Sequence, residues 1–551
     1  MLSKYCFILL IYCIFLLNNC DNVYTANAEF YSSVHQMSKL VVFESVFLKH
    51  TQKFIKANED KLDFLKARLA ELERDHSEAL QEGPNYIDSP VNKYLLTKRL
   101  TVDWERIENL MQHDTGKKSL TKIENYKNAH TYPNASELDG AIEGFLRIQD
   151  VYRLKAMDMA QGLLDGVKYD TKLDANLCFD IAKYAAKENK TRFAHAWAAE
   201  ALARLSKSKV LSNDQLMLKA PVARANVLQL LAKVKTDLGD LKGANQTYAE
   251  LVKLRPDVEN YTTDYMELQS NNGKNINESS DLDEEHEPLP SNLLITDEAT
   301  RYKHICNGLI AQSPAEEREL RCGYLTETHP FLQIAPIKVE ELNHDPLLVI
   351  YYDVLSDAEI EIMHELNNNR IERASVMGLN QSIISPVRTS QFSFMPKTTH
   401  RVLETIDMRV EDMTNLNMTF AEDHQFQNYG IGGHYAQHHD YFHPDTDVKI
   451  FSSPEMGNRI ATVLFYLTDV EQGGGTAFPY LKRLLMPKKG SAVFWYNLHA
   501  YGEPDRRTLH GGCPIIAGSK WVLNRWIREF VQSDRRPCEL WPDIYFEDLY
   551  S

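Results

Sequence analysis

The residues best suited to chemistry lie near the C-terminus. His438 and Asp440 are two positions apart, His510 lies on a later segment, and Lys520 follows His510 by ten residues. Two imidazoles and one carboxylate can hold Fe(II) and still leave coordination positions open for a co-substrate and O₂. A lysine near the last histidine could anchor that co-substrate. The spacing therefore predicts a metal site.

Strands are the elements that would position these ligands. Alternate side chains of a strand share a face, so in a strand over 434–440 His438 and Asp440 point the same way and His439 points away. His510 must then come from another strand. Short β-type runs at 459–467, 490–496 and 520–527, separated by Gly-rich turns, predict an antiparallel barrel-like sandwich.

Less specific interpretations compete with the metal site. An isolated His-x-Asp pair is common on surfaces and in core hydrogen bonds, and His434, His439 and His443 show that nearby histidines need not be ligands. Lys520 could be a surface lysine beside Trp521. The combination of the pair, the distant histidine, the lysine and the β-rich sequence favours the site.

Six motifs occur in order over residues 340–540: Tyr429-Gly-Ile-Gly-Gly, His438-x-Asp440, Gly457-Asn-Arg-Ile-Ala-Thr462, Phe494-Trp-Tyr-Asn-Leu498, His510-Gly-Gly-Cys-Pro514 and Lys520-Trp521. This set resembles the catalytic domain of the collagen prolyl 4-hydroxylase α-subunit family, and weaker similarity extends through the mature chain. The resemblance implies a procollagen-proline 4-dioxygenase that couples oxidative decarboxylation of 2-oxoglutarate to 4-hydroxyproline formation.

The resemblance also implies residue roles. His438, Asp440 and His510 would ligate Fe(II), and Lys520 would pair with the distal carboxylate of 2-oxoglutarate. Related dioxygenases such as the lysyl hydroxylases use arginine there, so Lys520 favours the prolyl 4-hydroxylase branch. L-ascorbate is implied as a further reductant.

Other implied contacts surround this core. Tyr429, Thr462 and Trp526 fall where family members line the 2-oxoglutarate pocket, although packing in a β-core is the alternative for each. Arg388 and Glu422 fall where related enzymes contact the peptide, and either could be an ordinary surface charge.

The compartment is indicated by the N-terminus. A lysine precedes an apolar run at 7–17 that is too short to span a bilayer, and Ala26-Asn-Ala28 offers a cleavage site. Residues 1–28 are therefore predicted as a signal peptide leading to the endoplasmic reticulum lumen, with no transmembrane anchor. A net charge of −16 argues against nucleic-acid binding.

Five cysteines remain after the signal segment: Cys178, Cys306, Cys322, Cys513 and Cys538. An oxidising lumen predicts two bridges and one spare thiol. Sequence proximity and the resemblance pair Cys306 with Cys322 and Cys513 with Cys538, and the second bridge would restrain the strand of His510. N-glycosylation is permitted at Asn134, Asn189, Asn245, Asn260, Asn277, Asn380 and Asn417.

The N-terminal half is predicted to be helical. Residues 29–135 are expected to form one helical region, and within it apolar residues recur every seven positions from 34 to 69: Val34, Val41, Leu48, Ile55, Leu62 and Leu69. The resemblance makes this segment a dimerisation region, and packing within its own domain is the alternative. It further implies assembly with the protein disulfide isomerase β subunit as α₂β₂, which would retain a chain that carries no Lys-Asp-Glu-Leu type ending.

Residues 140–262 are predicted as tetratricopeptide-like helix pairs, the region that binds proline-rich substrate in the family. Where many members carry groove tyrosines, this chain has Leu230, Lys233 and Thr236, which weakens polyproline docking. An acidic linker (263–291), a connecting segment (292–339), the catalytic domain (340–540) and a tail (541–551) complete the prediction.

The predicted fold class is thus α+β multidomain: an all-α N-terminal half followed by a C-terminal double-stranded β-helix, or jelly roll. Two alternatives to collagen-type hydroxylation stay open. One is a related 2-oxoglutarate dioxygenase acting on a non-collagen peptide, and the other is a non-catalytic peptide-binding subunit. Retention of the whole charge constellation argues against the second.

Overall fold

A computed structural model describes residues 34–130, 132–133, 135–207, 224–271, 285–286, 289–290, 292, 296–368, 370–373, 376–377, 382–383, 389–443 and 457–539. Two compact units are present, His35–Asn134 and a second that holds everything from Ala135 onward. The predicted signal segment, the tail from 541, Arg388 and the sequons at 134, 277 and 380 lie outside the described residues. Within the described part of the chain, no helix has the length and apolarity needed to cross a membrane.

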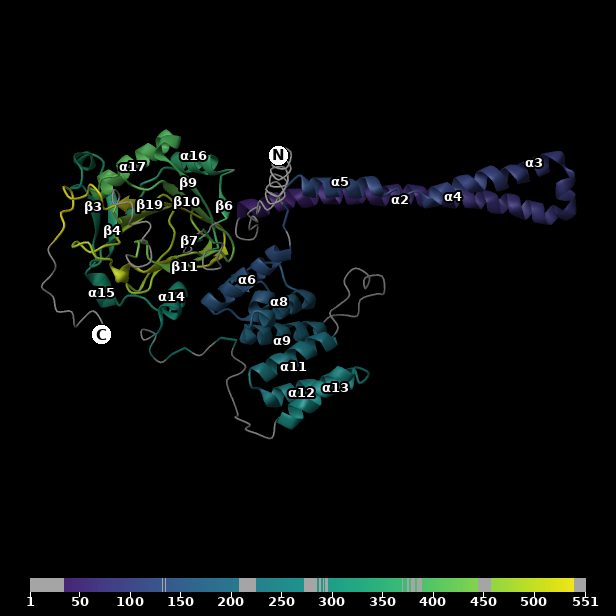
Figure 1. Ribbon diagram of the computed structural model, residues 1–551, viewed down its shortest axis with the longest axis horizontal. Coiled ribbons are helices and arrows are strands. Elements are labelled where there is room, and N and C mark those ends of the chain that lie inside the picture. The colour runs from purple at the N-terminus through teal and green to yellow at the C-terminus, as the bar shows by residue number, and fades with distance from the viewer. Residues whose placement is uncertain are drawn as a thin grey trace, which may run out of the picture. The chain divides into compact units, whose positions relative to one another are not determined.

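The first unit is a helical hairpin (Figure 1). The long helix α2 (Val34–Glu82) is followed by η1 (Gly83–Asp88), α3 (Pro90–Lys98), the π-helical turn η2 (Arg99–Asp103), α4 (Trp104–Gln112) and α5 (Lys117–Asn128), which return along it. Contacts between distant positions hold the hairpin closed. Lys61 Nζ donates to the carbonyl of His113 at 2.7 Å, and the rings of Phe43 and Tyr126 meet edge to face at 5.5 Å.

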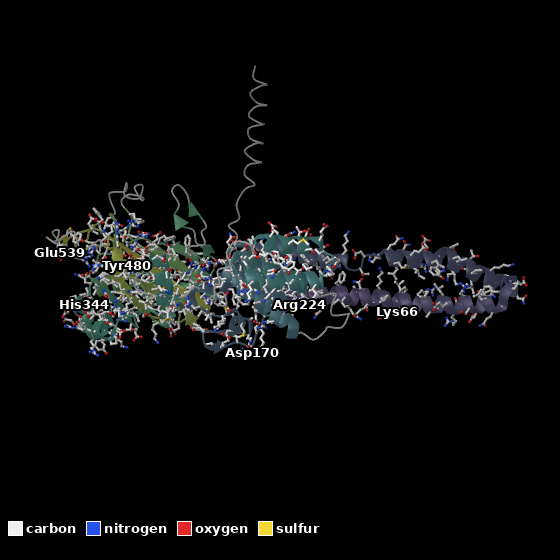
Figure 2. All side chains as sticks on the ribbon, turned by 90° about the horizontal axis from the view of Figure 1, so that it is seen from below. Lys66, Asp170, Arg224, His344, Tyr480 and Glu539 are labelled. Atoms are coloured by element: carbon white, nitrogen blue, oxygen red, sulfur yellow. A yellow bond between two sulfur atoms is a disulfide. The ribbon has the colours of Figure 1, made fainter. Side chains whose placement is uncertain are left out.

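Helix α2 has two apolar stripes with different fates. Phe43, Phe47 and Phe54 are half-buried against the returning helices. The predicted heptad positions are instead 48% to 67% exposed: Val41, Leu48, Ile55, Leu62 and Leu69. Lys66 lies among the side chains that project from the hairpin in Figure 2. Packing within its own unit therefore does not account for the heptad stripe.

The second unit begins with helices α6 (Ala135–Tyr152) and α7 (Ala156–Ala160) and a small hairpin, β1 (Leu163–Leu164) and β2 (Val167–Lys168). Antiparallel pairs follow near the predicted positions: α8 (Ala175–Lys187) with α9 (Thr191–Lys207), and α11 (Arg224–Asp237) with α12 (Leu241–Leu254). Asp174 and Asp240 cap α8 and α12 by accepting from backbone amides, which explains where these helices start. Trp197 is fully buried at the centre of the helical core.

The predicted linker starts too early. Helix α13 (Glu259–Asn271) extends beyond 263, because Tyr265 and Leu268 pack into the core formed by α11 and α12. Glu285, placed in the linker by its acidic surroundings, is docked onto the helices: it accepts from the amide of Ala156 at 2.7 Å and from Gln149 Nε2 at 3.0 Å. Burial raises the pKa of the Glu285 carboxyl group.

Two sheets form the C-terminal half (Figure 1). The larger has the order β3-β4-β5-β16-β12-β19-β10-β9-β6, and the smaller has the order β11-β17-β14-β15. The bounds are β3 Cys322–Leu325, β4 Ile337–Asn343, β5 Leu348–Tyr352, β6 Glu372–Arg373, β9 Gln391–Met395, β10 His424–Tyr429, β11 Tyr435–His438, β12 Arg459–Tyr466, β14 Thr476–Phe478, β15 Arg483–Leu485, β16 Ala492–Tyr496, β17 His510–Gly512 and β19 Lys520–Arg528. A short pair, β13 (Gln472–Gly473) and β18 (Ile515–Ala517), lies beside them, as does the pair β7 (Val376–Met377) and β8 (Ser382–Ile383).

The large sheet has two buried faces. Along β12, Ala461, Val463 and Phe465 belong to one core, and Leu464 and Tyr466 belong to another. The first core includes residues of helices α16 (Asp357–Asn367) and α17 (Arg401–Thr414), and the second lies between the sheets. This alternation follows from the two-residue period of strands. The predicted fold class, an all-α half followed by an antiparallel jelly-roll-type half, is confirmed.

The predicted disulfide pairing is wrong. Cys306 bonds to Cys513, with Cα atoms 5.7 Å apart, and Cys178, Cys322 and Cys538 are free thiols. Cys306 ends helix α14 (Glu298–Cys306), which packs with Ala477 of the small sheet around Cys513. Sequence proximity was a poor guide because tertiary packing brings the end of α14 to the end of β17.

Candidate metal and co-substrate site

The three predicted ligand residues come together at one end of the small sheet. His438 ends β11 and lies opposite His510, the first residue of β17. Asp440 follows just past the strand, so a bend rather than strand alternation brings it to the same side. The candidate ligand atoms of all three lie within 4.8 Å of one another. Within the described ranges, no other group of three or more such residues is arranged this way.

Hydrogen bonds orient both imidazoles. His438 Nδ1 lies 2.9 Å from the carbonyl of Ala436, and His510 Nδ1 lies 3.0 Å from that of Thr508. Since a carbonyl only accepts, each Nδ1 carries the proton and each Nε2 presents a lone pair. The Nε2 atoms are 3.6 and 3.7 Å from the two carboxylate oxygens of Asp440.

Asp440 is held from two sides. Thr462 Oγ1 donates to its Oδ2 at 2.8 Å, and Asn497 Nδ2 donates to Thr462 Oγ1 at 2.9 Å. Arg459 donates to the backbone carbonyl of Asp440 at 3.2 Å. Burial raises the pKa of Asp440, but the opposing charges of His510, His438 and Arg459 prevail and lower it overall. The carboxylate is therefore poised as an anion.

Aromatic rings fix the remaining faces of the imidazoles. Tyr435 stacks on His438 with ring centroids 3.6 Å apart, and Phe478 and Trp495 pack against His510 at 5.4 and 4.8 Å. Neither histidine can turn without displacing a ring. A preorganised ligand set follows.

Lys520 lies in the same pocket, which is bounded by both histidines, Asp440 and Tyr429. Its Nζ donates to Thr476 Oγ1 at 3.1 Å, and the ring of Tyr466 lies 5.6 Å away. Burial lowers the pKa of Lys520 to about 7. No carboxylate of the described residues pairs with it. A buried ammonium of this kind calls for an anionic ligand.

The other predicted pocket residues have different surroundings. Thr462 is bonded to Asp440, and Trp526 lies under the guanidinium of Arg459, 3.7 Å from its carbon. Neither lines the pocket, whereas Tyr429 does. Glu422 pairs with Arg459 at 2.6 Å and Arg528 at 3.1 Å, so a peptide would compete with two arginines for it.

The remaining histidines stay apart from this cluster. His439 Nε2 meets the carbonyl of Arg506 at 3.1 Å and its ring stacks on Tyr441, His434 bonds to Thr389, and His443 is exposed. Sequence reasoning missed Gln427, Tyr435, Thr476 and Asn524, which also line the pocket. Gln427 could have been found, because it lies two positions before Tyr429 on the same face of β10.

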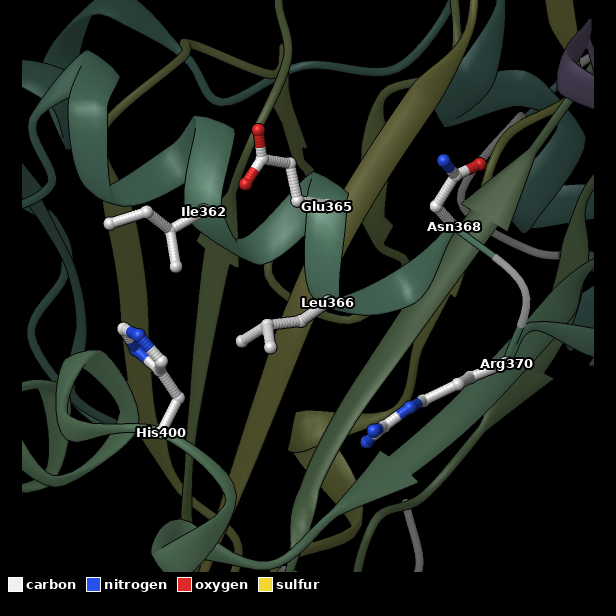
Figure 3. Close-up of a pocket in the computed structure, with 6 residues that line it drawn as sticks. All are labelled: Ile362, Glu365, Leu366, Asn368, Arg370 and His400. Atoms are coloured by element: carbon white, nitrogen blue, oxygen red, sulfur yellow. The ribbon is translucent and has the colours of Figure 1, made fainter.

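Another pocket, of about 500 Å³, lies against helix α16 and shares no lining residue with the histidine pocket. His400 and Arg370 reach toward it from opposite sides in Figure 3. Among the described residues, none that lines this pocket belongs to a group of three or more possible metal ligands.

Known proteins share much of this sequence. Residues 33–166 match the prolyl 4-hydroxylase α-subunit N-terminal region, and residues 424–528 match the 2OG-Fe(II) oxygenase superfamily. Prolyl 4-hydroxylase subunit alpha-1 of Homo sapiens is 33% identical over 526 residues, covering 94% of this chain and 96% of that protein. The subunit alpha-1 of Caenorhabditis elegans is 34% identical over 524 residues, covering 94% and 91%.

A solved structure of viral collagen prolyl hydroxylase from Paramecium bursaria Chlorella virus-1, in its 2-oxoglutarate complex, is 25% identical with a TM-score of 0.27. It covers 33% of this chain and 95% of that one. A TM-score this low supports no inference, and the fold rests on the strands described above.

The sheets and the match over 424–528 define an oxidoreductase of the 2-oxoglutarate- and Fe(II)-dependent oxygenase class. Because the likeness to α subunits extends over nearly the full length of both chains at 33% identity, the chain belongs to the prolyl 4-hydroxylase α-subunit family.

Proposed function

We propose that this chain is a peptidyl-proline 4-hydroxylase of the procollagen type. His438, Asp440 and His510 would hold Fe(II), and Lys520 would bind the distal carboxylate of 2-oxoglutarate. The observation that carries the proposal is the shared pocket: two Nε2 lone pairs and a carboxylate on one side, and a buried ammonium on the other. The donor set suits Fe(II), and the ammonium suits a dicarboxylate.

With Fe(II) and 2-oxoglutarate bound, O₂ would decarboxylate 2-oxoglutarate to succinate and CO₂ while a proline C4–H bond becomes C–OH. The chain's own groups position these reactants. Lys520 fixes one end of the co-substrate, and the bonded imidazoles and Asp440 fix the metal. The apolar walls given by Leu464, Trp495 and Val522 limit the access of water. L-ascorbate is proposed as the reductant that restores Fe(II).

The peptide is the least constrained part of the proposal. On α11, Leu230 is half-buried, Lys233 is exposed, and Thr236 donates to the carbonyl of Ala232 at 3.0 Å. None offers an aromatic face for a polyproline segment. A related dioxygenase acting on a non-collagen peptide is therefore the second candidate, and it rests on the lack of aromatic side chains at these three positions.

Self-association is proposed through α2. Its exposed heptad stripe matches the spacing of a coiled-coil seam, and a second copy of the same helix would bury it. Assembly with the protein disulfide isomerase β subunit as α₂β₂, residence in the endoplasmic reticulum lumen and a signal peptide over 1–28 are proposed on the resemblance. The disulfide of Cys306 and Cys513 favours an oxidising compartment.

The test is turnover with a panel of proline-containing peptides, using the full chain co-produced with the isomerase. Peptide-stimulated succinate together with hydroxylated proline, identified by mass spectrometry, is expected. His510→Ala should abolish coupled turnover, whereas His439→Ala, a neighbouring histidine outside the cluster, should retain it. Succinate coupled to another hydroxylated residue would select the second candidate, and no stimulated succinate would reject the enzyme.

A further inference from the structure

Helix α6 faces both halves of its unit. On one face, the ring of Phe145 packs against Trp197 at 5.7 Å, and Gln149 Oε1 accepts from Trp197 Nε1 at 2.7 Å, which joins α6 to the helical core. Gly144 and Arg147 lie on another face and meet the loop before β11. A helix predicted to belong with the peptide-binding half therefore also contacts the catalytic half.

The approach of Gly144 is close enough to require glycine at position 432. Gly432 has φ +69°, and a Cβ there would lie 2.6 Å from the Cα of Gly144. Beside it, Arg147 is 10% exposed, and its Nη1 donates to the carbonyl of Gly432 at 2.7 Å and to Thr389 Oγ1 at 3.2 Å. Backbone contact and charged hydrogen bonds together make this a built interface.

Arg147 completes a hydrogen-bond network between Thr389 and His434. The Thr389 amide donates to the His434 carbonyl at 3.0 Å, and the His434 amide donates to Thr389 Oγ1 at 3.1 Å. That oxygen already accepts from Arg147, so its own proton goes to His434 Nδ1 at 2.8 Å. The next residue along the chain is Tyr435, whose ring stacks on His438. This hydrogen-bond network thus fixes β11, the strand that presents His438.

The end of α6 reaches the segment of the second histidine. Tyr152 donates its hydroxyl proton to the carbonyl of Pro514 at 2.7 Å. The hydroxyl lies so close to Gly473 that a Cβ at that position would be only 2.8 Å from the Tyr152 oxygen. Pro514 lies four residues after His510. The two segments are also joined directly, because the Gly432 amide donates to the carbonyl of Ile515 at 2.8 Å.

We infer that α6, through Arg147 and Tyr152, positions both histidine-bearing segments, so that the metal centre depends on a helix outside the jelly roll. Arg147 is a positioning residue: it acts through Thr389 and His434, and touches neither ligand. The helical half is consequently linked to the proposed metal centre by the hydrogen bonds of Arg147 and Tyr152. This inference rests on the proposed metal site.

The experiment uses Arg147→Met and Tyr152→Phe in the full chain, stripped of metal and titrated with Co(II), followed by its visible absorption. Arg147→Met should weaken Co(II) binding about tenfold, the order expected for losing a charge-assisted hydrogen bond, and Tyr152→Phe should weaken it less. In Fe(II)-loaded protein, Arg147→Met should also raise the ratio of succinate to hydroxylated peptide. Arg147→Lys should recover part of both losses.

Arg204→Met is the matched control. Arg204 is 18% exposed and likewise donates to a backbone carbonyl, that of Leu173 at 2.6 Å. Here, however, the donor and the acceptor both lie in the helical half. Equal thermal midpoints for the two Met variants with weakened Co(II) binding only in Arg147→Met support the inference. Unchanged Co(II) binding and unchanged coupling in Arg147→Met overturn it. Wild-type protein that binds no Co(II) would instead reject the proposed metal site itself.

Discussion

Hydrogen bonds fix the proposed ligand atoms before any metal arrives. His438 and His510 each direct Nδ1 to the carbonyl two residues earlier, and Asp440 accepts from Thr462. Such outer partners set the tautomer and orientation of metal ligands and raise their affinity. At the scale of single residues, Thr462 would therefore act on the proposed metal through Asp440.

Thr462→Val tests this role. Loss of the bond to Asp440 also leaves Asn497 Nδ2 without its acceptor, so metal affinity should fall by about 10- to 100-fold. Thr462→Ser, which keeps the hydroxyl, should bind Co(II) nearly as well as the wild type. A raised KM for 2-oxoglutarate with unchanged Co(II) affinity would show that Thr462 serves the co-substrate pocket instead.

Lys520 predicts a pH dependence of co-substrate binding. Burial lowers its pKa to about 7, and a carboxylate ligand needs the ammonium form. The KM for 2-oxoglutarate should therefore be flat below pH 7 and rise by up to about tenfold per pH unit above it. Lys520→Arg stays charged and should give a flat profile. Parallel profiles for the two proteins would contradict the assignment.

The same burial affects stability. The pKa of Lys520 in the folded chain lies below the ordinary 10.5, so between these values the unfolded chain binds a proton that the folded chain does not. The contribution of this group to the free energy of unfolding therefore rises with pH across that window. In co-substrate-free protein, Lys520→Met should raise the thermal midpoint at pH 7, with the gain shrinking toward pH 10.

At the scale of elements, the exposed heptad stripe of α2 is the surface proposed for self-association. Replacing Leu48 and Leu62, which are 58% and 52% exposed, by Glu should weaken self-association at least about tenfold by placing charge on the seam. Sedimentation of the assembled protein measures the effect. Leu120→Glu is the control, since Leu120 is similarly exposed on α5. Equal dissociation by both changes would show that the stripe is not the interface.

Elements also decide which short motifs become a site. The turn before β11 and the segment after β17 carry no ligand, yet their mutual hydrogen bonds and the contacts from α6 set the spacing of His438 and His510. The positions of the two histidines thus depend together on the turn before β11, the segment after β17 and helix α6.

For the whole molecule, the bond between Cys306 and Cys513 joins α14 to the end of β17 over 207 positions. Peptide mapping without reduction should recover these two cysteines linked. Cys306→Ser should lower the free energy of unfolding by roughly 2–5 kcal/mol, because closing a long loop restrains the unfolded chain. Recovery of Cys306 linked to Cys322 would contradict this pairing, and Cys322→Ser serves as the control.

Much of the fold was predictable. Heptad spacing, capped helix pairs and alternating strands are local patterns, so the helical half and the antiparallel half followed from the sequence. The linker boundary did not, because composition cannot distinguish an acidic helix end from a solvated segment. Disulfide pairing failed for a related reason: proximity along the chain carries little information once α14 packs on a distant sheet.

The sequence by itself determined the chemistry, since a His-x-Asp pair, a distant histidine and a following lysine specify the ligand types whatever surrounds them. Only the tertiary structure decided how they are held. The bond from Thr462 to Asp440 and the contact of Arg147 with the loop before β11 join separate segments of the chain. The bend that turns Asp440 toward the histidines and the burial that lowers the Lys520 pKa also depend on what packs around them. Such contacts arise from packing, and no local pattern encodes them.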